Sequence, residues 1–163
     1  YNDEDLRLKP HMDGHQLAQV LDQLDGMNIA LGQELKPFIV APSGTALCLV
    51  KHLDFYSIPH IASVAVTEVL DPRAIYEISH SPAVSVCFNS AGSKNDIIEG
   101  IKNSNCFVLC CLGDLTYWFD LIELVLGGIR KPVIAFDPIY DLRLKEGNYF
   151  MNSFIWVSAS NGN

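Results

Sequence analysis

The stretch PFIVAPSGTALCLVKHLDFYSIPHIASVAV, residues 37–66, decides the fold that we expect. It opens with a short apolar strand at 37–41 and passes through the turn Pro42-Ser43-Gly44-Thr45. A helix follows over Ala46–Tyr56, with its apolar side chains at helical spacing on one face. A second strand follows at once, over Pro59–Val66. Strand, turn, helix and strand in so short a span are typical of the βαβ unit of a parallel sheet.

The same alternation extends through the rest of the chain. A helix is predicted before the unit, over His15–Leu31, and a mixed connector with turns after it, over Glu68–Ser81. Beyond the connector we expect, in chain order, strand Val84–Phe88, helix Lys94–Lys102, strand Asn105–Leu112, helix Leu115–Leu126 and strands Pro132–Phe136 and Ser153–Ser158. The sequence therefore predicts an α/β protein with parallel, buried strands.

Ligand sites in parallel sheets lie beyond the carboxyl ends of the strands. In this chain those ends are followed by loops at Ala41–Thr45, Val66–Thr67, Asn89–Ser93, Gly113–Asp114 and Asp137–Tyr140. We expect any small-molecule site to be built from these loops.

Composition and charge indicate a folded, acidic protein. The 163 residues suffice for one ordinary domain or two small lobes, and 49% hydrophobic with 18% charged residues is typical of a globular chain. A net charge of -8 disfavours nucleic acid and anionic membrane surfaces as partners. No apolar run approaches the roughly 20 residues that cross a bilayer, so we predict no direct membrane insertion of this segment. The absence of a starting Met favours a fragment of a longer protein.

Cysteine and histidine usage gives no sign of a metal site. The cysteines are Cys48, Cys87, Cys106, Cys110 and Cys111. Most of them stand in apolar runs, which favours buried thiols over a disulfide framework, and their spacing is not that of zinc ligands. His11 and His15 are four residues apart, but no third ligand joins them. We therefore predict no metal and no cofactor.

The turn Ser43, Gly44 and Thr45 is the first candidate binding loop. Amides and hydroxyls at a helix N-terminus can hold a carboxylate or a phosphate, and the alternative is a plain turn with a helix cap. The loop is not a P-loop, because no Gly-Lys-Ser/Thr follows it, and the chain contains no G-x-G-x-x-G.

Two carboxylates are further candidates. Asp114 follows the most apolar strand, where an acid binds a ribose, an ammonium or a metal, or else caps the next helix. Glu123 lies in an otherwise apolar helix, where a carboxylate can do acid/base or nucleophilic work, or else simply faces solvent. A serine hydrolase of the α/β type is excluded, since the chain has no Gly-x-Ser-x-Gly elbow.

Four segments resemble a known receptor family. Residues 38–45, 49–53 and 58–65 look like the first lobe of type I periplasmic-binding-like domains. These are the clamshell ectodomains of natriuretic-peptide-type guanylyl cyclase receptors and ionotropic glutamate receptors, whose first lobe runs strand, "Gly-Pro-Ser-Ser", helix and an "Ile-Pro-x-Ile-Ser" strand. Ala41 stands where the family often has Gly. Residues 95–112 are similar to the short helix and apolar strand of the family, but only residues 83–93 separate Pro82 from that helix, where the family usually has a longer stretch.

The resemblance implies an extracellular, dimeric, ligand-binding module of a signalling receptor rather than an enzyme. It implies a lobe-one-like segment at 1–82 and a lobe-two-like segment at 83–163, which close by a hinge around a small molecule or peptide. The implied ligand-binding residues are Ser43, Gly44, Thr45, Ser63 and Thr67 on one wall, and Asp114 and Asp137 on the other. The helix Ala46–Tyr56 would form a homo- or hetero-dimer surface.

A second resemblance implies a different function. Ile97, Cys106–Leu112, Trp118, Glu123 and the strand from Lys131 are also similar to nucleotide-cleaving TIR and deoxyribosyltransferase domains, which are single flavodoxin-like units. That resemblance implies a cytoplasmic enzyme in which Glu123 stabilises an oxocarbenium-like centre during cleavage of an N-glycosidic bond. A third alternative is a non-catalytic interaction module of the same fold.

Overall fold

A computed structural model describes residues 14–31, 34–55, 62–68, 72–110, 115–136 and 154–157. Its strands are β1 (Pro37–Ala41), β2 (Ala62–Val66), β3 (Val84–Asn89), β4 (Cys106–Cys110), β5 (Lys131–Phe136) and β6 (Phe154–Val157). Its helices are α2 (Gly14–Leu31), α3 (Ser43–Leu53), α4 (Pro72–Ser79), α5 (Lys94–Asn103) and α6 (Leu115–Leu126). The predicted α/β class with parallel βαβ units is confirmed.

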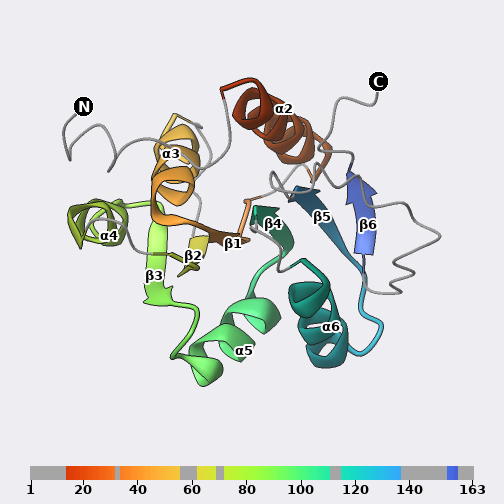
Figure 1. Cartoon of the computed structure of the whole chain (residues 1–163). Helices are drawn as coiled ribbons and strands as arrows, with labels where there is room; N and C mark the ends of the chain where they lie inside the picture. The colour runs from red at the N-terminus through yellow and green to blue at the C-terminus, as the bar shows by residue number, and fades with distance from the viewer. Residues whose placement is uncertain are drawn as a thin grey trace.

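The described strands form one sheet in the order β3-β2-β1-β4-β5-β6, and every neighbouring pair is parallel. The chain adds β2 and β3 on one side of β1 and then returns to add β4, β5 and β6 on the other. Because βαβ crossovers are right-handed, this reversal puts the helices that precede it and those that follow it on opposite faces of the sheet. Accordingly α2, α3 and α4 cover one face and α5 and α6 the other (Figure 1).

The two central strands are buried along their whole length. On β1, Phe38 and Val40 belong to the core under α5 and α6, whereas Ile39 and Ala41 belong to the core under α2, α3 and α4. Both faces of the strand are therefore apolar, which explains the unbroken hydrophobic run that the sequence shows there.

The structure differs from the two-lobe expectation. Strands from both sides of residue 82 pair directly, β2 with β3 and β1 with β4, so the segments 1–82 and 83–163 share one sheet. The order also differs from the flavodoxin-like order 2-1-3-4-5. Each helical crossover returns the chain to the same sheet, so no second sheet forms among the described residues.

The mixed connector predicted over Glu68–Ser81 contains a helix that the sequence did not predict, α4 (Pro72–Ser79). The pair Asp71-Pro72 reads as a turn in sequence, but proline is also favoured at the first position of a helix. Ala74 and Ile78, one turn apart, are the buried residues of this helix. The apolar spacing, and not the proline, therefore determines the structure.

Two contacts hold α5 against the sheet. A Cβ atom built on Gly100 would lie 2.6 Å from Phe38 Cε1, so only glycine permits this approach of the helix. At the helix C-terminus, the Lys131 ammonium donates hydrogen bonds to the carbonyls of Ile101 (3.2 Å), Lys102 (3.2 Å) and Ser104 (2.6 Å). A cation at this position also opposes the partial negative charge of the helix end.

The four cysteines among the described residues are free thiols. Burial raises the pKa of both Cys106 and Cys110 to about 12. It also raises the pKa of Cys48 and of Cys87, which are half-buried. Cys111 lies outside the described residues. These thiols are therefore protonated at neutral pH and act as small apolar groups.

Candidate functional site

The turn that follows β1 is closed by the chain itself. Ser43 and Thr45 are fully buried, and Gly44 between them is buried as well. The Ser43 amide donates to the Glu68 carbonyl at 3.0 Å, and the Thr67 amide donates to the Ala41 carbonyl at 3.0 Å. The ends of β1 and β2 are thus tied together over the start of α3, and the turn packs as part of the core.

The other predicted binding residues do not gather at this turn. Thr67 lies beside it, at the carboxyl end of β2 and half-buried. Ser63 lies four residues earlier on the same strand, roughly 13 Å away at about 3.3 Å per residue. Asp114 and Asp137 lie outside the described residues. The structure therefore brings Ser43, Gly44, Thr45 and Thr67 together and separates Ser63 from them.

A pocket opens at the same carboxyl edge of the sheet, between the N-terminal halves of α5 and α6. Its volume is about 330 Å³. It is lined by Ser90, Ala91, Gly92, Ser93, Lys94, Ile97, Ile98, Tyr117 and Leu121. We call it the α5–α6 pocket, and Asn89–Ser93 is one of the loops from which the sequence predicts a ligand site.

Hydrogen bonds fix the loop that forms one wall of this pocket. The Asn89 side-chain oxygen accepts from the Ala91 amide at 2.8 Å, and the Asn89 carbonyl accepts from the Gly92 amide at 3.2 Å. The Ser90 amide donates to the Val66 carbonyl of β2 at 3.0 Å. Asparagine is common in turns because its side chain bonds the backbone two residues on. The loop therefore presents its serines from a defined position.

The start of α5 follows directly. Ser93 occupies the N-cap position, but its side chain makes no capping hydrogen bond. Lys94 is the first residue of the helix and is exposed. The pocket thus has an ammonium group, two serine hydroxyls and the positive end of a helix dipole on one side.

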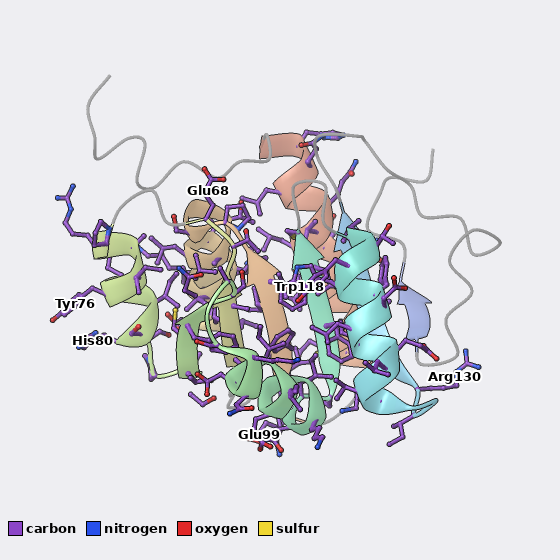
Figure 2. All side chains as sticks on the ribbon, turned by 60° about the horizontal axis from the view of Figure 1, so that its bottom comes forward. Glu68, Tyr76, His80, Glu99, Trp118 and Arg130 are labelled. Atoms are coloured by element: carbon purple, nitrogen blue, oxygen red, sulfur yellow. The ribbon has the colours of Figure 1, made fainter. Side chains whose placement is uncertain are left out.

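The opposite wall is apolar and comes from α6. Trp118 is 3% exposed and packs beneath the helix, with its ring 6.1 Å from that of Phe38; Figure 2 shows it between α6 and the sheet. Its neighbour Tyr117 is 58% exposed and lines the pocket together with Leu121. The buried indole anchors the helix, and this leaves the tyrosine ring at the mouth of the pocket.

This lining indicates what kind of ligand fits. Lys94 is the charged residue among the residues that line the pocket, and no carboxylate is among them. An anionic group suits the side of Lys94 and the two hydroxyls, and a flat apolar group suits the side of Tyr117 and Leu121. The α5–α6 pocket is therefore the best candidate site in the described part of the chain.

Glu123 lies apart from this pocket. It is half-buried and six residues after Tyr117 on α6, roughly 9 Å further along the helix axis. It is not among the residues that line the pocket. No described geometry therefore places this carboxylate beside a ligand at the carboxyl edge.

The helix predicted as a dimer surface is largely covered by its own chain. α3 packs between α2 and α4, and most of its residues are buried. Lys51 lies 3.9 Å from Glu77 of α4, and His52 Nε2 lies 2.8 Å from Asp25 of α2. Phe55, just past the helix, is 85% exposed. Dimerisation through this helix remains a prediction.

Sequence reasoning missed the side chains that line the pocket, although it named the Asn89–Ser93 loop. The signal for Lys94 was its place directly after a strand-end loop. Tyr117 had no clear signal, because the helix Leu115–Leu126 is apolar on several sides and its register decides which ring is exposed.

Among the described residues, no group of three or more histidine, cysteine or acidic side chains is placed to hold a metal. No described helix combines the length and apolar character that a membrane span requires. No family model, curated protein or solved structure matches this chain. Function is therefore inferred from the pocket itself.

Proposed function

We propose that this domain binds a small anionic ligand with a flat apolar part, of the size and class of a mononucleotide, in the α5–α6 pocket. The observation that carries the proposal is the lining, in which Lys94 and two serines face Tyr117 without a carboxylate among them. The pocket also lies at the carboxyl edge of the sheet, where ligands of parallel sheets bind.

The strand order supports this class of ligand. The order 3-2-1-4-5-6 is that of nucleotide-binding α/β domains. The chain has no G-x-G-x-x-G loop for a pyrophosphate, and a volume of about 330 Å³ is at the lower end for ligand pockets. Both features favour a single nucleotide over a dinucleotide.

The receptor resemblance remains a proposal about context. In that context the domain would act as the ligand-binding module of a signalling receptor, on the extracellular side, and would not need catalysis. The β1–α3–β2 segment supports it, since its strand, turn and helix follow the family pattern. The proposal about the pocket does not depend on this context.

The test measures binding of AMP to the protein. The readout is either calorimetry or the shift of the melting temperature. Adenosine and inorganic phosphate are the two matched fragments. We expect AMP to bind more tightly than either fragment, because it uses both walls of the pocket. We expect Lys94→Met to weaken AMP about tenfold while leaving adenosine unchanged, since one charge-assisted contact contributes about 1.4 kcal/mol. Tyr117→Ser is expected to weaken both AMP and adenosine.

Matched controls separate the pocket from general effects of charge and surface. Lys102→Met removes a lysine from the other end of α5, and Tyr76→Ser removes an exposed ring from α4, whose position Figure 2 shows. Neither control is expected to change AMP binding. Loss of binding in Lys102→Met equal to that in Lys94→Met, or no AMP binding at millimolar concentration, would contradict the proposal.

A further inference from the structure

A second cavity, of about 500 Å³, runs along the flank of α5 that faces β2 and β3. It is lined by Lys36, Ser63, Ser85, Val86, Asp96, Glu99, Gly100, Asn103 and Ser104. We call it the polar trough. It shares no lining residue with the α5–α6 pocket and extends toward the amino ends of the strands.

One wall of the trough is a single face of α5. Asp96, Glu99, Gly100 and Asn103 are spaced by three or four residues, so they stand above one another on the helix. Gly100 lets this face lie close to Phe38 of β1. Figure 2 shows Glu99 on this helix, at the surface of the molecule. The wall therefore carries two carboxylates one turn apart and an amide a further turn along.

The floor of the trough comes from the starts of β2 and β3, which α5 leaves partly uncovered. β3 is an edge strand, and Ser85 and Val86 near its start are exposed, Val86 at 36%. Ser63 is the adjoining residue of β2, and the Ser85 hydroxyl donates to the Ala62 carbonyl at 3.2 Å. Parallel strands are normally covered by apolar contacts on both faces, whereas the hydroxyls of Ser63 and Ser85 lie at this part of the sheet. The floor of the trough is therefore partly polar.

Lys36 supplies the opposite charge near the end of α5. Its amide donates to the Asn105 side-chain oxygen at 2.8 Å, and its carbonyl accepts from the Asn105 amide at 2.9 Å. Its backbone is therefore fixed beside Asn105, which directly follows the lining residues Asn103 and Ser104. The axial rise from Glu99 to Asn103 is roughly 6 Å, and from Asp96 to Asn103 roughly 10 Å. Negative and positive side chains thus lie at different levels of one cavity.

We propose that the polar trough binds a linear zwitterion, an amino acid whose ammonium and carboxylate groups are at opposite ends of a short chain. The ammonium binds between Asp96 and Glu99, and the carboxylate binds at Lys36. The hydroxyls of Ser63 and Ser85 and the Asn103 amide border the chain between them. The site is separate from the proposed nucleotide pocket, and its occupation does not require that proposal to hold.

The test uses 6-aminohexanoate. Ordinary bond lengths place its two charged groups roughly 7 Å apart when the molecule is extended. Hexylamine carries the amine alone, hexanoate carries the carboxylate alone, and glycine carries both without the spacing. Chemical-shift changes in the intact chain report binding of each probe. We expect 6-aminohexanoate to bind at least about tenfold more tightly than each of the other three, in accord with the loss of one charged contact.

Two variants assign the two ends. Glu99→Gln is expected to weaken 6-aminohexanoate and hexylamine about tenfold and to leave hexanoate unchanged. Lys36→Met is expected to weaken 6-aminohexanoate and hexanoate and to leave hexylamine unchanged. Lys102→Met is the charge control, because Lys102 lies on α5 like Glu99 but does not line the trough. It is expected to change the binding of none of these probes. Circular dichroism of each variant verifies that the fold is retained.

Three results would overturn the proposal. The first is the absence of 6-aminohexanoate binding at millimolar concentration to the folded protein. The second is equal affinity for glycine and 6-aminohexanoate, which would remove the two-ended arrangement. The third is binding that neither Glu99→Gln nor Lys36→Met changes. AMP binding measured on the same samples distinguishes failure at the trough from failure at the α5–α6 pocket.

Discussion

Replacing Gly100 with alanine tests how closely α5 packs on the sheet. The added methyl group would lie 2.6 Å from Phe38 Cε1 and 2.8 Å from Phe38 Cδ1. Carbon atoms in contact are normally about 3.5 to 4.0 Å apart, so either the ring or the helix must move by roughly 1 Å. The ring has little freedom, because it packs against Phe88, Phe107 and Trp118 at centroid distances of 6.4, 6.2 and 6.1 Å.

Two opposing effects set the magnitude. Overpacking a core typically costs about 1 to 3 kcal/mol, whereas alanine is favoured over glycine inside a helix by about 1 kcal/mol. We expect the steric cost to win in Gly100→Ala, with a net destabilisation of about 1 to 2 kcal/mol. For a chain of this size, that lowers the melting temperature by about 2 to 8 °C.

The assay is urea unfolding followed by circular dichroism, with Gly26→Ala as the matched control. Gly26 lies inside α2, and a Cβ atom built there meets nothing within 4 Å. The control is therefore expected to stabilise the protein by about 0.5 to 1 kcal/mol. If Gly100→Ala stabilises the protein as much as Gly26→Ala, the close approach of α5 to Phe38 is refuted. A smaller cost of Gly100→Ala in a Phe38→Leu background would identify the ring as its cause.

Three further predictions concern a helix end, a pair of thiols and a glycine. Removing the ammonium that caps α5, in Lys131→Met, is expected to lower the free energy of unfolding by about 1 to 2 kcal/mol, with Lys131→Arg losing less; urea titration measures both. Cys106 and Cys110 have folded-state pKa values of about 12, well above the roughly 8.5 of an unfolded thiol. The contribution of these two thiols to the free energy of unfolding is therefore complete below about pH 8.5 and is lost as the pH rises toward 12. The free energy of unfolding should fall by about 3 kcal/mol for the pair between pH 8.5 and 10. Urea unfolding at both pH values measures this fall, and Cys110→Ala should remove about half of it. Gly127 ends α6 with φ of 59°, so Gly127→Ala is expected to lower stability by about 1 to 2 kcal/mol, and an unchanged melting temperature would contradict the assigned backbone conformation.

Most elements of the fold were predictable because their apolar patterns are local. α6 begins and ends where the sequence predicts, at Leu115 and Leu126, and the buried strand from Cys106 was visible as a continuous apolar run. The helix after Pro72 was missed, since a proline fits both a turn and a helix start. The order of the strands in the sheet was not predictable, for another reason. Pairing of β1 with β4 joins distant segments, and no local pattern states which strands will be neighbours.

The candidate site was predictable only in its location. The rule that ligands bind beyond strand ends pointed to the Asn89–Ser93 loop, which does border a pocket. The same rule favoured Ser43 and Thr45, but both are buried. Their turn is closed by backbone hydrogen bonds to Thr67 and Glu68, which follow β2 and are distant in sequence, so the sequence alone did not reveal this burial. The polar trough is lined by one face of α5 and two strand starts, a combination that appears only when the helix is placed on the sheet.

The position of β4 in the middle of the sheet has a consequence for how the chain emerges from the ribosome. β1, β2 and β3 are synthesised first and can pair with one another at once, since β1 and β2 are linked by one short crossover. Until β4 is made, β1 has an edge of unpaired backbone N–H and C=O groups, flanked by apolar side chains. Such an edge invites pairing with a strand of another nascent chain. Slow translation between Asn89 and Cys106 would prolong this interval, so we expect slower synthesis over α5 to lower the amount of protein that reaches the native state.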